Sequence, residues 1–333
     1  MVRYGIAGFG LHAVRRLMPG FALAQRSRVV ALSRRDLQKG QAEAARFGIA
    51  HAFASTDELC RCPEVDAVFV TSPNAIHLAD VLTAIRHGKP VLCEKPMALN
   101  AGEAEQMTDA ADQSKVLLGI AQCFRFEESV RRIRESVQRG EIGRVVSIRS
   151  DFTHPGLASA RRWLHDAAIA GGGPIADVGV HCVDAMRYIL GDEPERVFAA
   201  TVADEHSGTV EASALLTLKF SSGAVGSSFV SFRAPYQSPI TVVGTEGTIL
   251  AHDGLTIEHP VVIERRKAGQ VETQVETQEV SNADTYARQV DAFSTAIEDG
   301  IPFPVPGEEG LQNQRILDAL YRSAQSGREE KIA

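Results

Sequence analysis

Short apolar runs rich in β-branched residues alternate with longer amphipathic segments through the first third of the chain. The runs lack a strict alternation of apolar and polar positions, which is typical of strands covered on both faces. The order of run and segment predicts βαβ units and a doubly wound parallel sheet. The predicted strands are 2–7, 28–32, 66–72, 90–95 and 116–122.

Helix boundaries are marked between these strands. Helices are predicted over 36–47 and 76–87, closed by Gly48 and Gly88. A further helix begins at Asn100, with Glu103 as its capping partner. Pro19 should end or kink the first helix, because proline has no N–H to donate.

The pattern changes after residue 121. Helices are predicted over 127–140 and 175–184, followed by strand-like segments joined by short turns, which indicate a large, mostly antiparallel open sheet. Those segments are 194–204, 210–220, 223–233, 239–250, 254–266 and 272–280. Two helices end the chain: the first, 284–300, carries an apolar stripe, and the second contains Ile316 and Leu320. We therefore expect an α/β chain with a Rossmann domain over 1–121 and an α+β domain over 122–333, whose C-terminal helix packs back on the first.

Composition narrows the class of protein. A net charge of -7 and a pI near 5.8 argue against nucleic acid or an anionic membrane as the main partner. No apolar run approaches the ~20 residues of a membrane span, and the first residues enter a strand pattern at once, leaving no room for a secretory signal. The five cysteines are odd in number and scattered, which favours reduced thiols. We expect a cytoplasmic protein.

A glycine-rich turn follows the first predicted strand. In "GIAGFGLHA", Gly8, Gly10 and Ala13 match the G-x-G-x-x-G/A pattern at the first βα turn. Such glycines allow a tight turn and bring a pyrophosphate close to the helix N-terminus. The turn therefore predicts a dinucleotide cofactor.

The end of the second strand bears on which dinucleotide binds. An acidic residue there would bind the ribose of NAD, but this chain has Ser33, Arg34 and Arg35. A hydroxyl and two guanidinium groups suit the 2′-phosphate of NADP. NADP is favoured, with NAD as the alternative, because the arginines can also be solvated loop residues and Asp36 lies beside them.

The stretch "IADVGVHCVD" places Asp177, His181 and Asp184 four and three residues apart, on one face of a helix. Three interpretations are open on the chemistry alone: a metal site, a proton-transfer site, or a helix with structural polar groups. No further cluster of ligands supports a metal, so none is predicted.

The stretch "VLCEKPMAL" at 91–99 resembles a motif of the glucose-fructose oxidoreductase/inositol dehydrogenase/MocA (Gfo/Idh/MocA) family. The resemblance to this family covers essentially the whole chain. The other matching motifs are the glycine turn, "TSPNAIH" at 71–77, "RGEIG" at 139–143, "GGGPIADVGVHCVD" at 171–184, "GTEGTI" at 244–249 and the helix of Tyr286. The resemblance implies a Rossmann domain, a sheet domain, and hydride transfer to or from a sugar, polyol or related carbinol in a cleft between them.

The resemblance also implies roles for single residues. Lys95 of the E-K-P motif is expected near the nicotinamide, before a cis proline, and the D-x-G-x-H motif corresponds to Asp177, Gly179 and His181. Members of the family use no catalytic metal. An imidazole that titrates near neutrality suits proton transfer with a substrate hydroxyl, and an ammonium stabilises a developing alkoxide. Asp177 would orient His181 or a substrate hydroxyl, whereas Asp184 is expected to be a structural partner.

The remaining candidate residues fall into two groups. The predicted cofactor-binding residues are Gly8, Phe9, Gly10, Leu11, His12, Ser33, Arg34, Arg35, Thr71, Ser72, Asn74, His77, Glu94, Lys95, Gln122 and Tyr286. The predicted substrate-binding residues are Lys95, Arg162, Trp163, Asp177 and His181. Many relatives have Trp-Arg where this chain has Trp163-Leu164, so the contact at Trp163 departs from the family pattern.

Taken together, the sequence predicts an NAD(P)-dependent oxidoreductase acting on CH–OH groups of carbohydrate-like small molecules. Two alternatives stay open: a glycosidase that oxidises its substrate transiently with a retained dinucleotide, and a non-catalytic dinucleotide-sensing regulator. An apolar face of the second domain's sheet would need a cover, which predicts a homodimer or homotetramer.

Overall fold

The computed structural model describes residues 1–267 and 274–332, which form two compact units. The first unit contains Met1–Gln122 and Tyr286–Gln314, and the second contains Cys123–Thr285 and Arg315–Ala333. The chain thus leaves the first unit one residue beyond the domain end predicted at 121. A segment within the predicted second domain, Tyr286–Gln314, belongs to the first unit.

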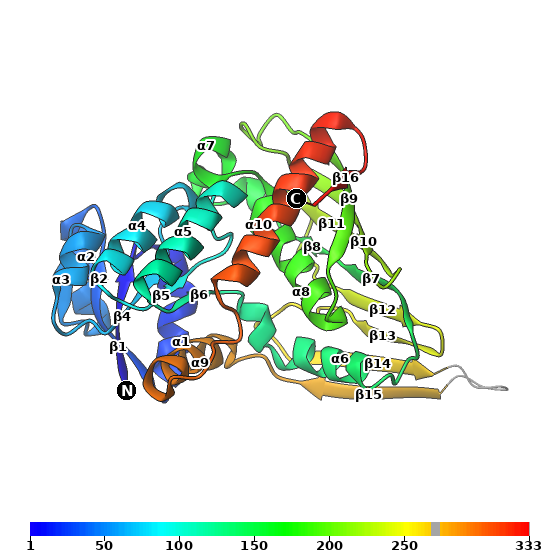
Figure 1. Ribbon diagram of the computed structural model, residues 1–333, viewed down its shortest axis with the longest axis horizontal. Helices are drawn as coiled ribbons and strands as arrows, with labels where there is room; N and C mark the ends of the chain where they lie inside the picture. The colour runs from blue at the N-terminus through cyan, green and yellow to red at the C-terminus, as the bar shows by residue number, and fades with distance from the viewer. Residues whose placement is uncertain (268–273, 333) are drawn as a thin grey trace. The chain divides into compact units, whose positions relative to one another are not determined.

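A parallel sheet forms the centre of the first unit (Figure 1). All of its strand pairs are parallel, and the strand order is the one found in dinucleotide-binding folds. The Rossmann prediction is confirmed. In spatial order the described strands are β3 (His51–Phe53), β2 (Ser27–Ser33), β1 (Val2–Ala7), β4 (Ala67–Val70), β5 (Val91–Cys93) and β6 (Leu118–Ile120). The sequence did not predict β3, whose three residues are all half-buried.

Helices connect these strands and cover the sheet. Asn100 Oδ1 accepts a hydrogen bond from the Glu103 N–H at 2.9 Å, so the predicted capping pair is confirmed. Gly48 closes the second helix in a left-handed conformation with φ +67°. The helices are α1 (Met18–Leu23), α2 (Leu37–Phe47), α3 (Thr56–Arg61), α4 (Asn74–Arg86), α5 (Ala101–Ser114), α9 (Thr285–Asp299) and the first part of α10 (Gly307–Ser326).

Pro19 does not end the first helix. It is the second residue of α1, directly after a π-helical turn over Ala13–Leu17. A π-helical turn replaces the usual bond to residue i−4 with one to residue i−5, as in the N–H of Met18 to the carbonyl of Ala13. The predicted interruption is therefore a change of helix type, which accommodates a residue without an N–H.

The second unit is built on a large mixed sheet. Most of its strand pairs are antiparallel, as predicted, while β7 and β8 pair with β11 in parallel. In spatial order the described strands are β15 (Gln274–Val280), β14 (Val261–Lys267), β13 (Gly247–Ala251), β12 (Ile240–Gly244), β7 (Val145–Ser150), β11 (Val225–Ser231), β10 (Ser213–Phe220), β9 (Pro194–Val202) and β16 (Glu330–Lys331), with β8 (Phe152–Thr153) beside β11.

Several strands of this sheet differ from the prediction. The segment 239–250 forms a hairpin of two strands, β12 and β13, rather than one. The strand expected over 254–266 begins only at Val261, after Pro260. Of the strand expected over 272–280, residues 272 and 273 lie outside the described residues. The strands β7, β8 and β16 were not predicted.

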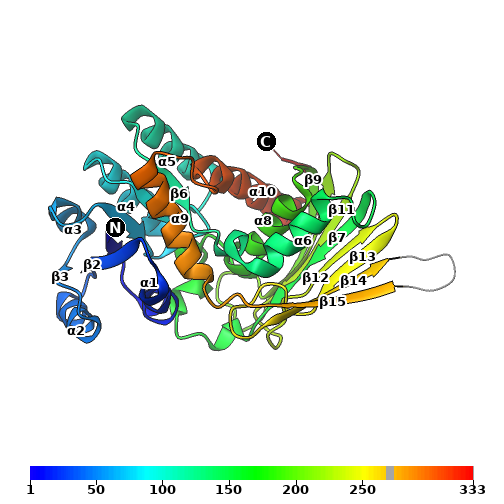
Figure 2. The same cartoon turned by 90° about the horizontal axis from the view of Figure 1, so that it is seen from below.

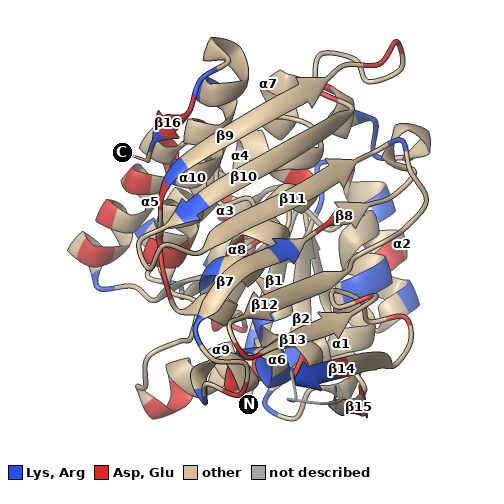
Figure 3. Cartoon of the chain, turned by 90° about the vertical axis from the view of Figure 1, so that its right-hand side faces the viewer, with Lys and Arg blue, Asp and Glu red and all other residues tan. Residues whose placement is uncertain are grey.

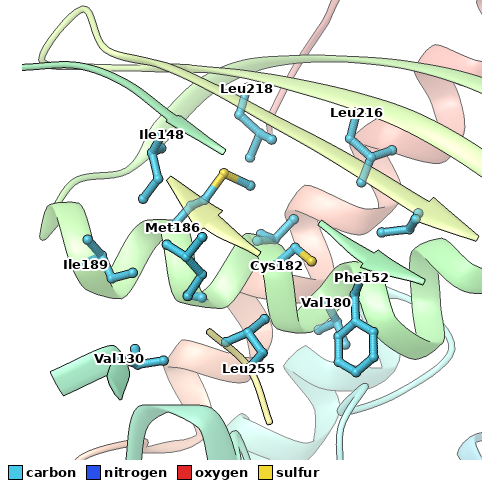
Figure 4. Packing of buried hydrophobic residues seen from close by; sticks show 14 of the residues in the cluster. Val130, Ile148, Phe152, Val180, Cys182, Met186, Ile189, Leu216, Leu218 and Leu255 are labelled. Carbon is cyan, nitrogen blue, oxygen red and sulfur yellow. The ribbon is translucent and has the colours of Figure 1, made fainter. Parts of the chain in front are cut away.

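One face of this sheet packs against α6 (Glu128–Gln138) and α8 (Val180–Leu190), as Figure 2 shows. Buried side chains from α8 and the strands form the core between them, including Val180, Cys182, Met186 and Leu216 (Figure 4). Burying a large apolar side chain contributes about 1.5–3 kcal/mol, so this helix is firmly held. No helix lies over the opposite face of the sheet in the described part of the chain (Figure 3).

Candidate active site

The glycine turn of the first unit leaves no room for side chains. Gly8 has φ +77°, and a Cβ atom there would lie 2.5 Å from the Cα atom of Ser72. The N–H groups of Gly8 and Phe9 both donate to the carbonyl of Ser33, at 3.1 and 2.9 Å. The turn is thus fixed to the ends of β2 and β4, at the carboxyl edge of the sheet where ligands bind in such folds.

The residues after Gly8 differ in what they offer a ligand. Phe9 is buried and packs edge-on against Phe47, so it can reach a ligand only through its backbone. Gly10, Leu11 and His12 begin the helix, where N–H groups have no carbonyl partner within the helix. Such N–H groups favour an anion such as a pyrophosphate.

The end of β2 presents positive charge beside this turn. The Arg34 guanidinium donates to the carbonyl of Phe9 at 3.5 Å, while Arg35 is exposed and Ser33 is buried. The carboxylate of Asp36 caps α2 and pairs with Lys39 at 3.0 Å. The Lys39 hydrogen bonds lower the pKa of Asp36, so its negative charge is already matched.

The loop after β4 is held by its own hydroxyl groups. Thr71 Oγ1 donates to the carbonyls of Ala7 and Gly8, and Ser72 Oγ donates to the Asp80 carboxylate at 2.7 Å. Asn74 is buried at the start of α4. These bonds fix the loop next to Gly8.

His77 joins two loops of the first unit. One ring nitrogen lies 2.8 Å from the Ser72 carbonyl and the other 3.1 Å from the Pro96 carbonyl, and the residue is fully buried. Burial lowers the pKa of His77, although the carbonyl contacts oppose that shift. The imidazole therefore holds the loop that contains Lys95, and its part in cofactor binding stays a prediction.

A charged cluster surrounds the start of that loop. His12 Nε2 lies 2.8 Å from Glu94 Oε1, and the Glu94 carboxylate also accepts from the Lys95 N–H at 3.2 Å. Burial alone raises the pKa of Glu94, but His12 and Lys95 outweigh it and the net pKa is lowered. Tyr286, at the start of α9, packs edge-on against the His12 ring at 6.0 Å. The cluster brings together four of the predicted cofactor-binding residues.

The Lys95–Pro96 peptide bond is cis, as the resemblance implied. Lys95 is half-buried, and its side chain follows directly from the anchored Glu94.

In the second unit, Asp177 lies on a π-helical turn over Ile175–Gly179 that runs into α8. The predicted helix is therefore present, but its first turn is wider than an α-helix. His154 Nε2 lies 3.5 Å from Asp177 Oδ2, and Arg161 Nη2 lies 4.0 Å from the same oxygen. An imidazole and a guanidinium group thus flank this carboxylate.

His181 occupies an aromatic setting in the same unit. Its ring centroid lies 4.3 Å from that of Phe124 and 6.2 Å from that of Phe152. The ring centroids of Phe232 and His154 lie 5.1 Å apart, so aromatic rings pack against both histidines. Carboxylate, imidazole and guanidinium groups beside aromatic faces suit a hydroxylated substrate with apolar C–H surfaces.

Asp184 has the structural role expected for it. Its carboxylate accepts two hydrogen bonds from Arg125, at 2.7 and 2.8 Å, and both side chains are buried. Arg187 lies 3.9 Å from Asp184 and pairs with Glu193. A bidentate buried pair of this kind ties the turn before α6 to α8.

The structure distinguishes among the other candidates. Arg162 is exposed and Trp163 half-buried, whereas the neighbouring Arg161 is the arginine beside Asp177. Gln122 is buried at the end of the first unit. Sequence reasoning missed His154 and Arg161, because β8, the strand that precedes His154, was itself not predicted.

The described residues contain no group of three or more His, Cys, Asp or Glu side chains arranged to hold a metal ion. All five cysteines are buried, and none of them forms a disulfide. Among the residues that the structure describes, no helix is both long and apolar enough to span a bilayer.

Two family models match the chain. The model "Oxidoreductase family, NAD-binding Rossmann fold" matches residues 2–122, and the model "GFO/IDH/MocA C-terminal domain" matches residues 130–250. The chain belongs to the Gfo/Idh/MocA family of oxidoreductases. It is accordingly an NAD(P)-dependent dehydrogenase or reductase that acts on CH–OH groups.

Named relatives of this Gfo/Idh/MocA protein align over its full length. A 1,5-anhydro-D-fructose reductase from Ensifer adhaerens is 31% identical and covers 100% of this chain and 99% of its own. A D-xylose 1-dehydrogenase (NADP(+)) from Haloferax volcanii is 32% identical, with 97% and 98% covered. The structure of an aldose-aldose oxidoreductase from Caulobacter crescentus, complexed with glycerol, superposes with a TM-score of 0.91 at 28% identity over 99% of both chains.

The residues present fit a dinucleotide. A Cβ at Gly8 would collide with Ser72, which keeps this turn bare, and the helix start and Arg34 lie beside it. These features give the first unit a phosphate-binding turn with positive charge at the end of β2.

Proposed function

We propose that this protein is an NADP-dependent oxidoreductase of sugars, polyols or related small molecules. The observation that carries the proposal is the second-unit group of Asp177, His154 and Arg161 with the ring-packed His181, in a chain whose first unit has a dinucleotide turn. Full-length relatives named as a xylose dehydrogenase and an anhydrofructose reductase support this substrate class. Neither alternative has an observation of its own in its support.

Positive charge at the end of β2 supports a preference for NADP over NAD. Arg34 and Arg35 supply guanidinium groups at the end of β2, where NAD-binding folds place an acidic residue. The nearest carboxylate, that of Asp36, is already paired with Lys39. A 2′-phosphate would therefore meet net positive charge there. The relative from Haloferax volcanii, whose name includes NADP(+), agrees with this preference.

We assign the remaining cofactor contacts as the sequence predicted them. Gly10, Leu11 and His12 would offer N–H groups to the pyrophosphate, and Phe9 would contribute its backbone. The other proposed cofactor contacts are Gly8, Ser33, Thr71, Ser72, Asn74, His77, Glu94, Lys95, Gln122 and Tyr286.

The proposed catalytic residues are Lys95, Asp177 and His181. When bound, the nicotinamide supplies or accepts the hydride. His181 takes the hydroxyl proton during oxidation and returns it during reduction. The Lys95 ammonium stabilises negative charge on the same oxygen, and Asp177 orients a substrate hydroxyl. Arg162 and Trp163 remain proposed substrate contacts.

We further propose that the bare sheet face joins a second copy of the chain in a homodimer or homotetramer. That face carries exposed apolar side chains on several strands, including Leu215, Val225 and Phe229. A self-complementary apolar face is what a two-fold interface needs. We also place the protein in the cytoplasm, because its five buried cysteines form no disulfide.

Initial rates with NADP and NAD, measured in both directions on aldoses, ketoses and polyols, test the proposed function. We expect turnover of at least one hydroxylated substrate, with a higher kcat/KM for NADP. Binding of NADPH without turnover of any panel member would overturn the proposed activity. Cleavage of aryl glycosides with no net change in nicotinamide absorbance would support the glycosidase alternative instead.

A further inference from the structure

A half-buried carboxylate holds the start of the helical segment that carries Asp177. Glu211, just before β10, accepts hydrogen bonds from the N–H of Gly173 at 3.0 Å and from the N–H of Ile175 at 2.9 Å. The Tyr321 hydroxyl on α10 donates to the same carboxylate at 3.1 Å. Three donors from two separate segments thus converge on one side chain.

The loop around this carboxylate is built to fit it closely. A Cβ at Gly172 would lie 1.7 Å from the Tyr321 hydroxyl, and one at Gly173 would lie 2.2 Å from the Glu211 carbonyl oxygen. Larger residues at either glycine would push the loop away from Glu211. The glycine run before the motif therefore allows its N–H groups to reach the carboxylate.

This carboxylate is costly for the fold. Among the described residues it has no Lys, Arg or His partner, and burial raises its pKa despite the donated hydrogen bonds. A buried charge without a cation usually costs stability. The positive end of the helix segment offsets part of that cost. A glutamate kept at such a cost points to a role beyond packing.

The carboxylate is coupled to Asp177 through one backbone bond. The N–H of Asp177 donates to the carbonyl of Gly173 at 2.9 Å, and the N–H of the same Gly173 donates to Glu211. Movement of Gly173 therefore moves the turn on which Asp177 sits. His181 follows on the same continuous helix, in α8.

We propose that Glu211 is a positioning residue, whose carboxylate fixes the start of the π-helical turn and so sets the direction of Asp177 and His181. Its effect on the reaction rests on the proposed function, whereas its effect on the backbone does not. Tyr321 assists by orienting the carboxylate.

The Glu211→Gln variant tests this role. Glutamine has one acceptor oxygen, and its amide group would oppose the N–H of Gly173 or of Ile175. We expect kcat to fall by about 10- to 100-fold, the range for a misplacement of about 1 Å, with little change in NADPH affinity. Because a buried charge is removed, the Tm should stay near that of the wild type or rise.

Companion variants separate positioning from structure. Glu211→Asp keeps both acceptor oxygens and should retain more activity than Glu211→Gln. Tyr321→Phe keeps both backbone bonds and should lose less kcat. Glu205→Gln, which removes an exposed carboxylate elsewhere in the second unit, should match the wild type. If Glu211→Gln does not fold, Glu211→Asp is judged by the same criteria.

Hydrogen exchange supplies a readout independent of turnover. Peptides covering residues 171–181 should exchange faster in Glu211→Gln than in the wild type, while peptides from the first unit stay unchanged. Unchanged exchange, or a kcat loss that only follows a fall in Tm, would overturn the positioning role. If the wild type turns over no substrate, the proposed function fails and the exchange result still decides whether Glu211 holds the turn.

Discussion

Asp177 and His181 come from one short segment, but the side chains around them come from other parts of the second unit. His154 and Arg161 flank the carboxylate, while Phe124 and Phe152 pack around the imidazole. Each role that we propose in this site belongs to a single side chain. Exchanging single residues therefore distinguishes chemistry from cofactor binding.

The first prediction concerns the proposed catalytic pair. His181→Asn should lower kcat by roughly 10²–10⁴-fold, because positioned proton transfer contributes about that much. Lys95→Ala should lower kcat by roughly 10²–10³-fold, the cost of removing one group that stabilises developing negative charge. NADPH affinity, measured by fluorescence titration, should change little in His181→Asn and fall further in Lys95→Ala, because Lys95 is also a proposed cofactor contact. Wild-type rates in either variant would remove that residue from the catalytic set.

The second prediction concerns the choice of cofactor. The double change Arg34→Ala with Arg35→Ala should weaken NADP binding by about 10- to 100-fold, because hydrogen bonds to charged groups contribute about 1.5–3 kcal/mol. NAD binding should stay nearly constant, since NAD lacks the 2′-phosphate. Calorimetric titration of both cofactors gives the comparison.

A control that removes a positive charge at another site belongs with that experiment. Arg61→Ala removes an exposed arginine at the end of α3, away from the end of β2. It should leave the affinity for both cofactors as in the wild type. An equal loss of NAD and NADP affinity in the double variant would instead indicate a general electrostatic effect.

At the scale of elements, the glycine turn contains one glycine that the backbone packing requires and one that the approach of a ligand requires. Gly8 has a positive φ, and the space that a Cβ would occupy there is taken by the Ser72 backbone. A Cβ at Gly10 would lie 3.6 Å from its nearest atom, which is an ordinary contact. The two glycines of one motif thus serve different purposes.

The third prediction uses this contrast. Gly8→Ala should lower the Tm of the cofactor-free protein, because the strand ends must separate to admit a methyl group. Gly10→Ala should keep that Tm but weaken NADPH binding, since the methyl group would stand where the pyrophosphate approaches. Thermal scans with and without NADPH measure both effects, and equal loss of Tm in the two variants would contradict the distinction.

The sequence predicts elements well where one local signal governs them. The strands β1, β4 and β5 are compact apolar runs, and the glycines and Asn100 mark helix ends. By contrast, β3 and β8 are short, and their pairing depends on neighbouring strands. Local patterns carry no information about such pairing.

The same reasoning applies to the site. Residue spacing predicts that Asp177 and His181 lie on one helical segment, the family resemblance implies their roles, and the glycine motif predicts the turn. His154 could not be placed from sequence, because its proximity to Asp177 depends on β8 packing against the π-helical turn. The sequence predicts an ordinary helix where the π-helical turn lies, because the pattern of apolar residues does not distinguish a π-helical turn from an α-helical one.

At the scale of the whole molecule, the described residues leave one broad face of the second unit's sheet without a helical cover (Figure 3). Leu215 is 50% exposed on β10, beside the exposed Phe229 of β11 in the sheet. An apolar face of this extent would cost solubility if it stayed in water. The proposed assembly follows from that cost.

The fourth prediction tests the assembly. Leu215→Lys should lower the molar mass measured by light scattering, because each interface would bury two uncompensated ammonium groups. The control is Leu23→Lys in the first unit, where the leucine is 53% exposed and lies outside the sheet. An unchanged mass in Leu215→Lys would show that this face is not the interface.

The π-helical turn over Ile175–Gly179 also has a consequence for chain length. A π-helical turn holds about one residue more than an α-helical turn, so deleting Val178 would let an ordinary α-helical turn form and would change the rotation about the axis between Asp177 and His181. The segment would stay helical and apolar while its two polar groups diverged. For alignments and redesign, the number of residues between Asp177 and His181 therefore matters as much as their identity, and a one-residue gap there marks a changed site.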